Sequence, residues 1–297
     1  MRFRDRPAGA RCPAGTGPRS VVTMSDHPTA GAAGALFVPD GEHLVPTDLA
    51  RGPWSPDALH GGPVAALAAR AAERCVPAGD LQLVRVTLEL LRPVPTAPLS
   101  VSASVVRPGR KVQLVEVSVG AAGTEVARAH ALAIRRTPDG RPDGRPEVPT
   151  VAEDPAPAPP EAGITTPSLT DAYPAFHNGG MEIRFVKGRF DEPGPATVWF
   201  RLRCPVVAGE EPTPWERAAA AADFGNGVSA ELDIGTHVFI NPDLTVSLHR
   251  PPVGEWVCLD ARTRFGTPGI GVAESALWDV EGRVGRAVQN LLVEPAG

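Results

Sequence analysis

The sequence lacks the cysteine patterns that mark zinc and redox sites. Its four cysteines are scattered, and no two of them are spaced as C-x-x-C. We therefore expect free thiols in a reducing compartment, and no metal or redox cofactor. No apolar run approaches the roughly 20 residues that a membrane-spanning helix needs. The N-terminus is basic but has no apolar segment like that of a signal peptide, so we expect a cytoplasmic protein.

Positive charge is also not in excess. The chain has 29 Lys and Arg against 34 Asp and Glu, for a net charge of −5. Binding to phosphate backbones requires a basic face, so the charge argues against nucleic acid as the main partner. The sequence contains no G-x-S-x-G, G-x-x-x-x-G-K-[ST] or H-E-x-x-H motif. These absences argue against a nucleophile-elbow serine hydrolase, a P-loop protein and a zinc protease.

The composition divides the chain into four segments. Residues 1–35 are rich in Gly, Pro and Arg, and we expect them to be a disordered extension. Residues 36–136 form a first module, and residues 168–297 form a second. Between them, residues 137–167 contain many prolines and few large apolar side chains, which is typical of a semi-extended linker.

Each module combines one apolar helix with alternating strands. In the first, the helical spacing of Val64, Leu67, Ala68, Ala71 and Cys75 predicts a buried stripe, with Ser55 or Asp57 as the N-cap. In the second, we predict a helix from about Thr213 to Asp223. Antiparallel strands follow both helices, as in Leu99–Val106, where apolar residues alternate with serines. The predicted fold class is α+β: a double hotdog, in which each long helix is wrapped by a curved antiparallel sheet.

A repeated pattern relates the two modules. Both copies start with Arg-Pro after an apolar run, at Arg92 and Arg250, which are 158 positions apart (250 − 92 = 158). The same offset matches Ala131 to Gln289, so one strand carries an amide where its sister carries an alanine. We therefore predict that the modules superpose, that their sheets join edge to edge, and that the two modules share one working site.

Two groups of residues are candidates for that site. His60, Gly61 and Gly62 stand at a helix start, where backbone N–H groups can bind an oxygen that carries negative charge. Tight helix packing, with His60 as a cap, is the alternative explanation. Asp223 ends an alanine-rich stripe, where a carboxylate is costly unless it is bonded or functional. Gln289 either serves the same site or ties two strands together.

A polar triplet precedes the second Arg-Pro. Asn241, Asp243 and Thr245 would share one face of an extended segment, where they could hold a water molecule next to Asp223. A solvated strand edge is the competing interpretation.

These motifs together resemble the acyl-CoA thioesterase II family, the double-hotdog thioesterases, and the resemblance covers about residues 36–294. The motifs that carry it are W-x5-H-G-G-P from Trp54, PGRKVQLVEV from Pro108, ADFGNG from Ala222, FINPDLTVSLHRPP from Phe239 and VQNLL from Val288. The resemblance implies a catalytic Asp at Asp223 and a catalytic Gln at Gln289. The family also uses a Ser or Thr, and here Asn241 occupies that place, with Thr245 as a nearby hydroxyl.

The resemblance implies hydrolysis of an acyl thioester linked to CoA or to an acyl carrier protein. Asp223 would activate a water that Gln289 and Asn241 or Thr245 hold, while backbone N–H groups at His60–Gly62 stabilise the oxyanion. Direct attack by the carboxylate through an anhydride remains open. The other hypotheses are a non-hydrolytic acyl-thioester binding protein and a hotdog dehydratase. We expect no nucleic acid or membrane partner, and a homodimer is possible.

Overall fold

The computed structural model describes residues 34–76, 79–136, 155–167, 172–232, 236–266 and 269–295. The predictions for residues 1–33 and 137–154 lie outside them. The first half contains β1 (Phe37–Asp40), β2 (His43–Pro46), the 3-10 turn η1 (Asp48–Ala50), α1 (Gly61–Cys75), β3 (Leu81–Leu90), β4 (Leu99–Arg107), β5 (Val112–Ala121) and β6 (Thr124–Arg135).

The second half repeats this plan with additional elements. It contains the 3-10 turn η2 (Pro160–Ala162), the π-helical turn η3 (Phe176–Gly180), β7 (Met181–Arg189), β8 (Glu192–Leu202), α2 (Pro214–Ala222), α3 (Gly225–Val228), β9 (His237–Ile240), β10 (Asp243–Leu248), β11 (Trp256–Gly266), β12 (Ile270–Asp279) and β13 (Gly282–Pro295). The β1–β2 hairpin, α3 and the short turns were not expected, because segments of three to five residues carry little periodic signal.

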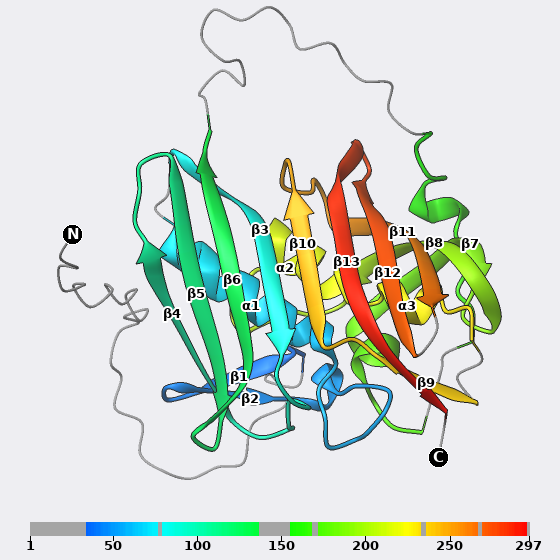
Figure 1. The fold of residues 1–297 in the computed structure, drawn as a ribbon, viewed down its shortest axis with the longest axis horizontal. Helices are drawn as coiled ribbons and strands as arrows, with labels where there is room; N and C mark the ends of the chain where they lie inside the picture. The colour runs from blue at the N-terminus through cyan, green and yellow to red at the C-terminus, as the bar shows by residue number, and fades with distance from the viewer. Residues whose placement is uncertain are drawn as a thin grey trace, which may run out of the picture.

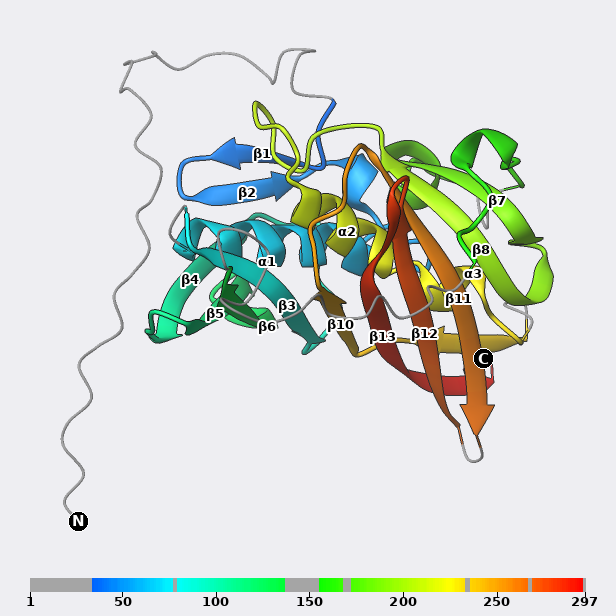
Figure 2. The same cartoon turned by 90° about the horizontal axis from the view of Figure 1, so that it is seen from above.

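All named strands belong to one 13-stranded sheet. The order is β1-β2-β4-β5-β6-β3-β10-β13-β12-β11-β8-β7, with β9 on β13, and every pairing between named strands is antiparallel (Figure 1). The two half-sheets meet edge to edge where β3 pairs with β10, as the repeat predicts. Figure 2 shows the sheet curving around α1 and α2, with the β1–β2 hairpin on the other side of the helices.

The strand register confirms the repeat. Thr87 pairs with Thr245 across the junction of the two half-sheets, and these residues are themselves equivalent under the offset of 158. In the first half Val115 lies opposite Ala131, and in the second half Ala273 lies opposite Gln289, at the same offset. Ala131 and Gln289 therefore hold equivalent positions in a double hotdog fold.

The two helices pack against each other under the sheet, and alanines permit the close approach. Eleven of the 15 residues of α1 are buried, and α2 buries all five alanines from Ala218 to Ala222. A capping box between Thr213 and Glu216 starts α2, with Pro214 in the first turn, so the helix begins at the predicted place. The N-terminus of each helix consequently lies close to the C-terminal end of the other.

Two sequence expectations need correction. Residues 155–167 are not a bare linker, because Ile164 pairs with Phe185 of β7 and the Ala158 carbonyl accepts a hydrogen bond from the Trp199 indole at 2.7 Å. Cys75 is disulfide-bonded, whereas Cys204 and Cys258 are free thiols.

No helix in the described part of the chain is long and apolar enough to cross a membrane.

Candidate active site

Asp223 lies at the C-terminal end of α2 and is buried, with its side chain 5% exposed. Its Oδ1 accepts hydrogen bonds from Asn241 Nδ2 at 2.9 Å and from Gln289 Nε2 at 3.3 Å. Its Oδ2 lies 2.8 Å from His60 Nδ1. A buried carboxylate is costly unless it has such partners. The structure thus brings together four of the predicted residues, three from the second module and His60 from the first.

Gln289 connects β13 to the end of α2. Its Oε1 accepts a hydrogen bond from the Asn226 backbone at 3.0 Å, and its Nε2 also lies 3.2 Å from the Asp223 carbonyl. The side chain is 1% exposed. Gly225 leaves room for it, because a Cβ there would come within 2.8 Å of Gln289 Oε1. The amide therefore fixes the backbone and the side chain of Asp223 at the same time.

His60 is the N-cap of α1, in place of the expected Ser55 or Asp57. Its Nδ1 lies 3.0 Å from the Gly62 backbone nitrogen. α1 begins at Gly61, directly after His60 and not next to Ser55 or Asp57, because Gly61 and Gly62 allow the start of the helix to pack closely against α2. A Cβ on Gly61 would lie 2.7 Å from Asp223 Oδ2, and a Cβ on Gly62 would lie 2.5 Å from the Ala220 carbonyl. Real Cβ atoms do not approach so closely, so these positions require glycine.

Aromatic rings enclose the imidazole of His60. The Phe224 ring lies 4.6 Å away between centroids, and the Phe176 ring lies 5.2 Å away at a steep angle. Phe176 comes from η3 and Phe224 directly follows Asp223, so both rings are placed by the backbone around the site. They pack against the imidazole and hold its ring plane.

Thr245 is not part of this group, contrary to the sequence prediction. On β10 the buried residues are Leu244, Val246 and Leu248, so Thr245 points to the opposite face, where its hydroxyl lies 3.3 Å from that of Thr87. Asp243 is also engaged elsewhere, since its carboxylate accepts bonds from the Asn290 backbone and side chain. The chain is interrupted between β9 and β10 at Asn241 and Pro242, and alternation counted through this break assigns the wrong face.

The opposite end of the helix pair carries the counterpart of the His60–Asp223 contact. There the N-cap of α2, Thr213, donates a hydrogen bond at 2.5 Å to Glu73 in the last turn of α1. Trp215, in the first turn of α2, is buried, and its indole bonds the Leu83 carbonyl at 3.0 Å. The first turn of α1 has glycines instead. Together with Ala131 in place of Gln289, this leaves one site with the full polar set.

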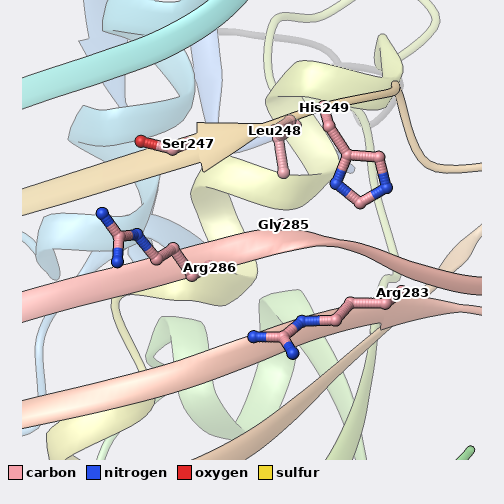
Figure 3. Close-up of a pocket in the computed structure, with 6 residues that line it drawn as sticks. All are labelled: Ser247, Leu248, His249, Arg283, Gly285 and Arg286. Carbon is pink, nitrogen blue, oxygen red and sulfur yellow. The ribbon is translucent and has the colours of Figure 1, made fainter. Parts of the chain in front are cut away.

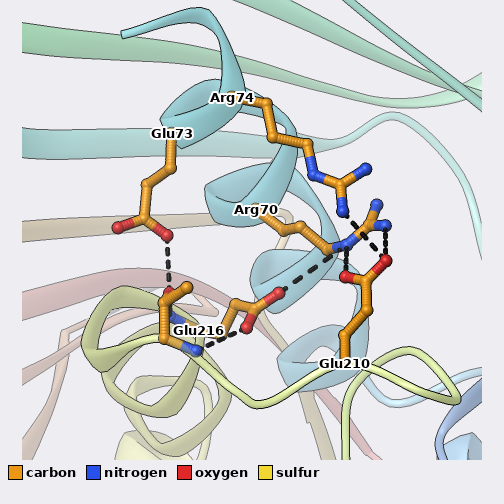
Figure 4. Close-up of polar contacts among 6 residues, drawn as sticks. Arg70, Glu73, Arg74, Glu210 and Glu216 are labelled. Carbon is orange, nitrogen blue, oxygen red and sulfur yellow. Dashed lines mark hydrogen bonds and ion pairs between the residues drawn. The ribbon is translucent and has the colours of Figure 1, made fainter. Parts of the chain in front are cut away.

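The charges that act on Glu73 come from Glu216 and Arg217 of α2. Figure 4 shows Glu216 beside it, and Arg70 and Arg74 bound to Glu210. Burial raises the pKa of Glu73 to about 7, with a further increase from the Glu216 charge, against the hydrogen bond from Thr213. At this end of the helix pair the helix termini carry the polar pair Glu73–Thr213, whereas the strand positions Val115 and Ala131 are apolar.

We expect Glu73 to make stability depend on pH. Its pKa is higher in the folded chain than its ordinary value of 4.5, so the folded state is favoured when this carboxyl is protonated. That contribution is present below about pH 4.5 and is lost as the pH rises through about 7. Glu73→Gln should raise the free energy of unfolding at pH 8 by up to about 3 kcal/mol and by much less at pH 5. Thermal melts of Glu73→Gln and of the exposed control Glu192→Gln at both pH values measure this; equal shifts at the two values would contradict it.

A cleft of about 350 Å³ lies away from the Asp223 group, beside the end of β10 and the start of β13. Figure 3 shows its lining residues, Ser247, Leu248, His249, Arg283, Gly285 and Arg286. None of them contacts Asp223 through a described hydrogen bond. The cleft is therefore separate from the candidate site.

Comparison with known proteins gives a consistent result. Residues 50–134 match the model of the acyl-CoA thioesterase N-terminal domain, and residues 142–293 match that of the C-terminal domain. No curated protein sequence matches the chain.

Solved structures share the fold. A hot dog fold protein from Alicyclobacillus acidocaldarius has a TM-score of 0.66 at 18% identity, covering 91% of this chain and 99% of its own. An acyl-CoA thioesterase II from Mycobacterium marinum has a TM-score of 0.59 at 17% identity, covering 80% and 90%. The two domain matches follow one another along most of the chain, so this chain belongs to the acyl-CoA thioesterase family.

Proposed function

We propose that the chain hydrolyses acyl thioesters of CoA or of an acyl carrier protein at the group formed by Asp223, His60, Asn241 and Gln289. The observation that carries this proposal is the buried Asp223 carboxylate, which N–H donors from both modules hold at one end of the helix pair. The family assignment supports a thioester as the substrate.

The geometry suits attack by water on a thioester carbonyl. Asp223 supplies the negative charge that makes a nearby water nucleophilic. The Asn241 amide donates its N–H groups to Asp223 and to the Asp243 carbonyl, so its Oδ1 can accept a hydrogen bond from that water. Gln289 acts by fixing Asp223, since its own amide is bonded to protein groups.

The start of α1 supplies donors for the oxyanion. N–H groups in the first turn of a helix have no partner within the helix, and they favour negative charge. One well-placed donor of this kind is worth about 3 kcal/mol of barrier. Hydrolysis then yields the free acid and the free thiol, with no group left on the protein.

Release of free CoA from acyl-CoA tests this function. The chain is incubated with a panel of acyl-CoA esters of increasing acyl length, and free thiol is followed with a chromogenic thiol reagent. We expect continuous release well above the spontaneous rate for at least one acyl length. A parallel assay with acyl carrier protein thioesters shows which carrier is used. Tight binding of acyl-CoA without release of thiol would contradict hydrolysis and favour a binding or accessory protein.

A further inference from the structure

We propose that His60 is the catalytic base of this site, taking the proton of the attacking water on Nε2 and returning it to the leaving thiolate. The inference rests on the proposed function and refines it, because Asp223 then acts as the anionic partner of the imidazole. The position of His60 in the sequence and its place at a helix start do not by themselves assign this role.

The hydrogen-bond geometry fixes where the imidazole carries its proton. Nδ1 lies 2.8 Å from Asp223 Oδ2 and 3.0 Å from the Gly62 nitrogen, but one nitrogen cannot donate to the carboxylate and accept from Gly62 at once. Asp223 Oδ1 already accepts two amide N–H bonds, from Asn241 and Gln289. At 2.8 Å, Oδ2 accepts a further hydrogen bond from the proton on Nδ1. Nε2 of the neutral ring then carries the free lone pair.

The free nitrogen is available for chemistry. No described residue donates to or accepts from Nε2, and the His60 side chain is 10% exposed, so the ring reaches the edge of the site. Phe176 and Phe224 hold the plane of the ring from two directions. A carboxylate on one ring nitrogen and a free lone pair on the other is the arrangement by which a histidine accepts a proton from a nucleophile.

The sister helix shows that capping alone does not require histidine. Thr213 caps α2 with its hydroxyl and also bonds Glu73, so a small hydroxyl residue meets both structural needs at the equivalent position. Histidine is not among the preferred N-cap residues, which are Asn, Asp, Ser and Thr. An imidazole at the cap of α1 is therefore explained by a property that threonine lacks, the ability to take up a proton.

The resulting step balances. The water oxygen forms a bond to the thioester carbonyl carbon while its proton passes to His60 Nε2, and the imidazolium is stabilised by Asp223. The tetrahedral intermediate then collapses, the carbon–sulfur bond breaks, and the Nε2 proton passes to the thiolate. The acid and the thiol leave, and His60 is neutral again.

His60→Asn tests the role without removing the cap. Asparagine is a good N-cap and can still donate to Asp223, but it has no second ring nitrogen. We expect thiol release from acyl-CoA to fall by about 10²- to 10⁴-fold, with an unchanged melting temperature and unchanged affinity for a non-hydrolysable thioether analogue of acyl-CoA. In His60→Ala, imidazole added to the buffer should restore part of the rate, whereas it should not restore Asp223→Asn.

The outcomes separate the two proposals. If the wild-type chain releases thiol and His60→Asn releases it at the same rate, the role of His60 is overturned and the proposed function stands. A slow His60→Ala that imidazole does not accelerate, together with weaker binding of the thioether analogue, would show that His60 only shapes the site, and would also overturn the role. If the wild-type chain releases no thiol from any acyl thioester, both proposals fail.

Discussion

Asp223→Asn should lose about three orders of magnitude in the rate of thiol release while remaining folded. The new asparagine amide has the same size as the carboxylate but carries no charge. Its N–H group must also point at one or more of the N–H donors that bond the carboxylate in the wild type. The mismatch with His60, Asn241 and Gln289 should cost about 1–2 kcal/mol of stability. Steady-state kinetics and a thermal melt measure the two effects.

Glu73→Gln is the matched control, because Glu73 makes the corresponding contact at the other end of the helix pair. It should keep the wild-type rate. If Asp223→Asn hydrolysed acyl-CoA as fast as the wild type, the carboxylate would have no part in the reaction, and a binding role would be the better interpretation.

Gly61→Ala should reduce turnover by about 10²-fold, because its new methyl group displaces the carboxylate of Asp223. The Cβ would lie 2.7 and 2.8 Å from the two carboxylate oxygens, which neighbouring groups hold in place. A misplacement of about 1 Å in a catalytic group can cost this much rate. Kinetics with the best acyl-CoA substrate measure the loss.

Gly227→Ala is the control for this glycine substitution. A Cβ at Gly227 meets no atom within 4 Å, so that variant should keep its rate. Equal rates for Gly61→Ala and the wild type would mean that Asp223 can shift without consequence, which a clamped catalytic carboxylate does not allow.

The sequence predicted those parts of the fold that depend on local pattern or on the repeat. The bounds of α2, its cap at Thr213 and the equivalence of Ala131 with Gln289 are confirmed, since each is encoded within one segment or in the offset between two similar segments. The edge-to-edge joining of the half-sheets is confirmed for the same reason.

The composition of the candidate site was harder to predict. The contact between His60 and Asp223 depends on how α1 and α2 pack, and no spacing within either segment encodes it. Asn241 and Thr245 were not separable because the strand is broken at Pro242, and the side-chain alternation does not continue through the break. The rings of Phe176 and Phe224 also escaped notice. Phe224 follows Asp223 directly, a signal that was available, whereas Phe176 enters from a distant turn.

Two duplicated modules with one full set of polar residues should bind one substrate. Isothermal titration of the wild-type chain with a non-hydrolysable thioether analogue, carrying the acyl group that gives the highest turnover, counts the sites directly. We expect one equivalent of the analogue bound per wild-type chain. We also expect Gly61→Ala to bind it with lower affinity than the wild-type chain does. Two equivalents per chain, or one equivalent with undiminished affinity in Gly61→Ala, would contradict a single site at Asp223.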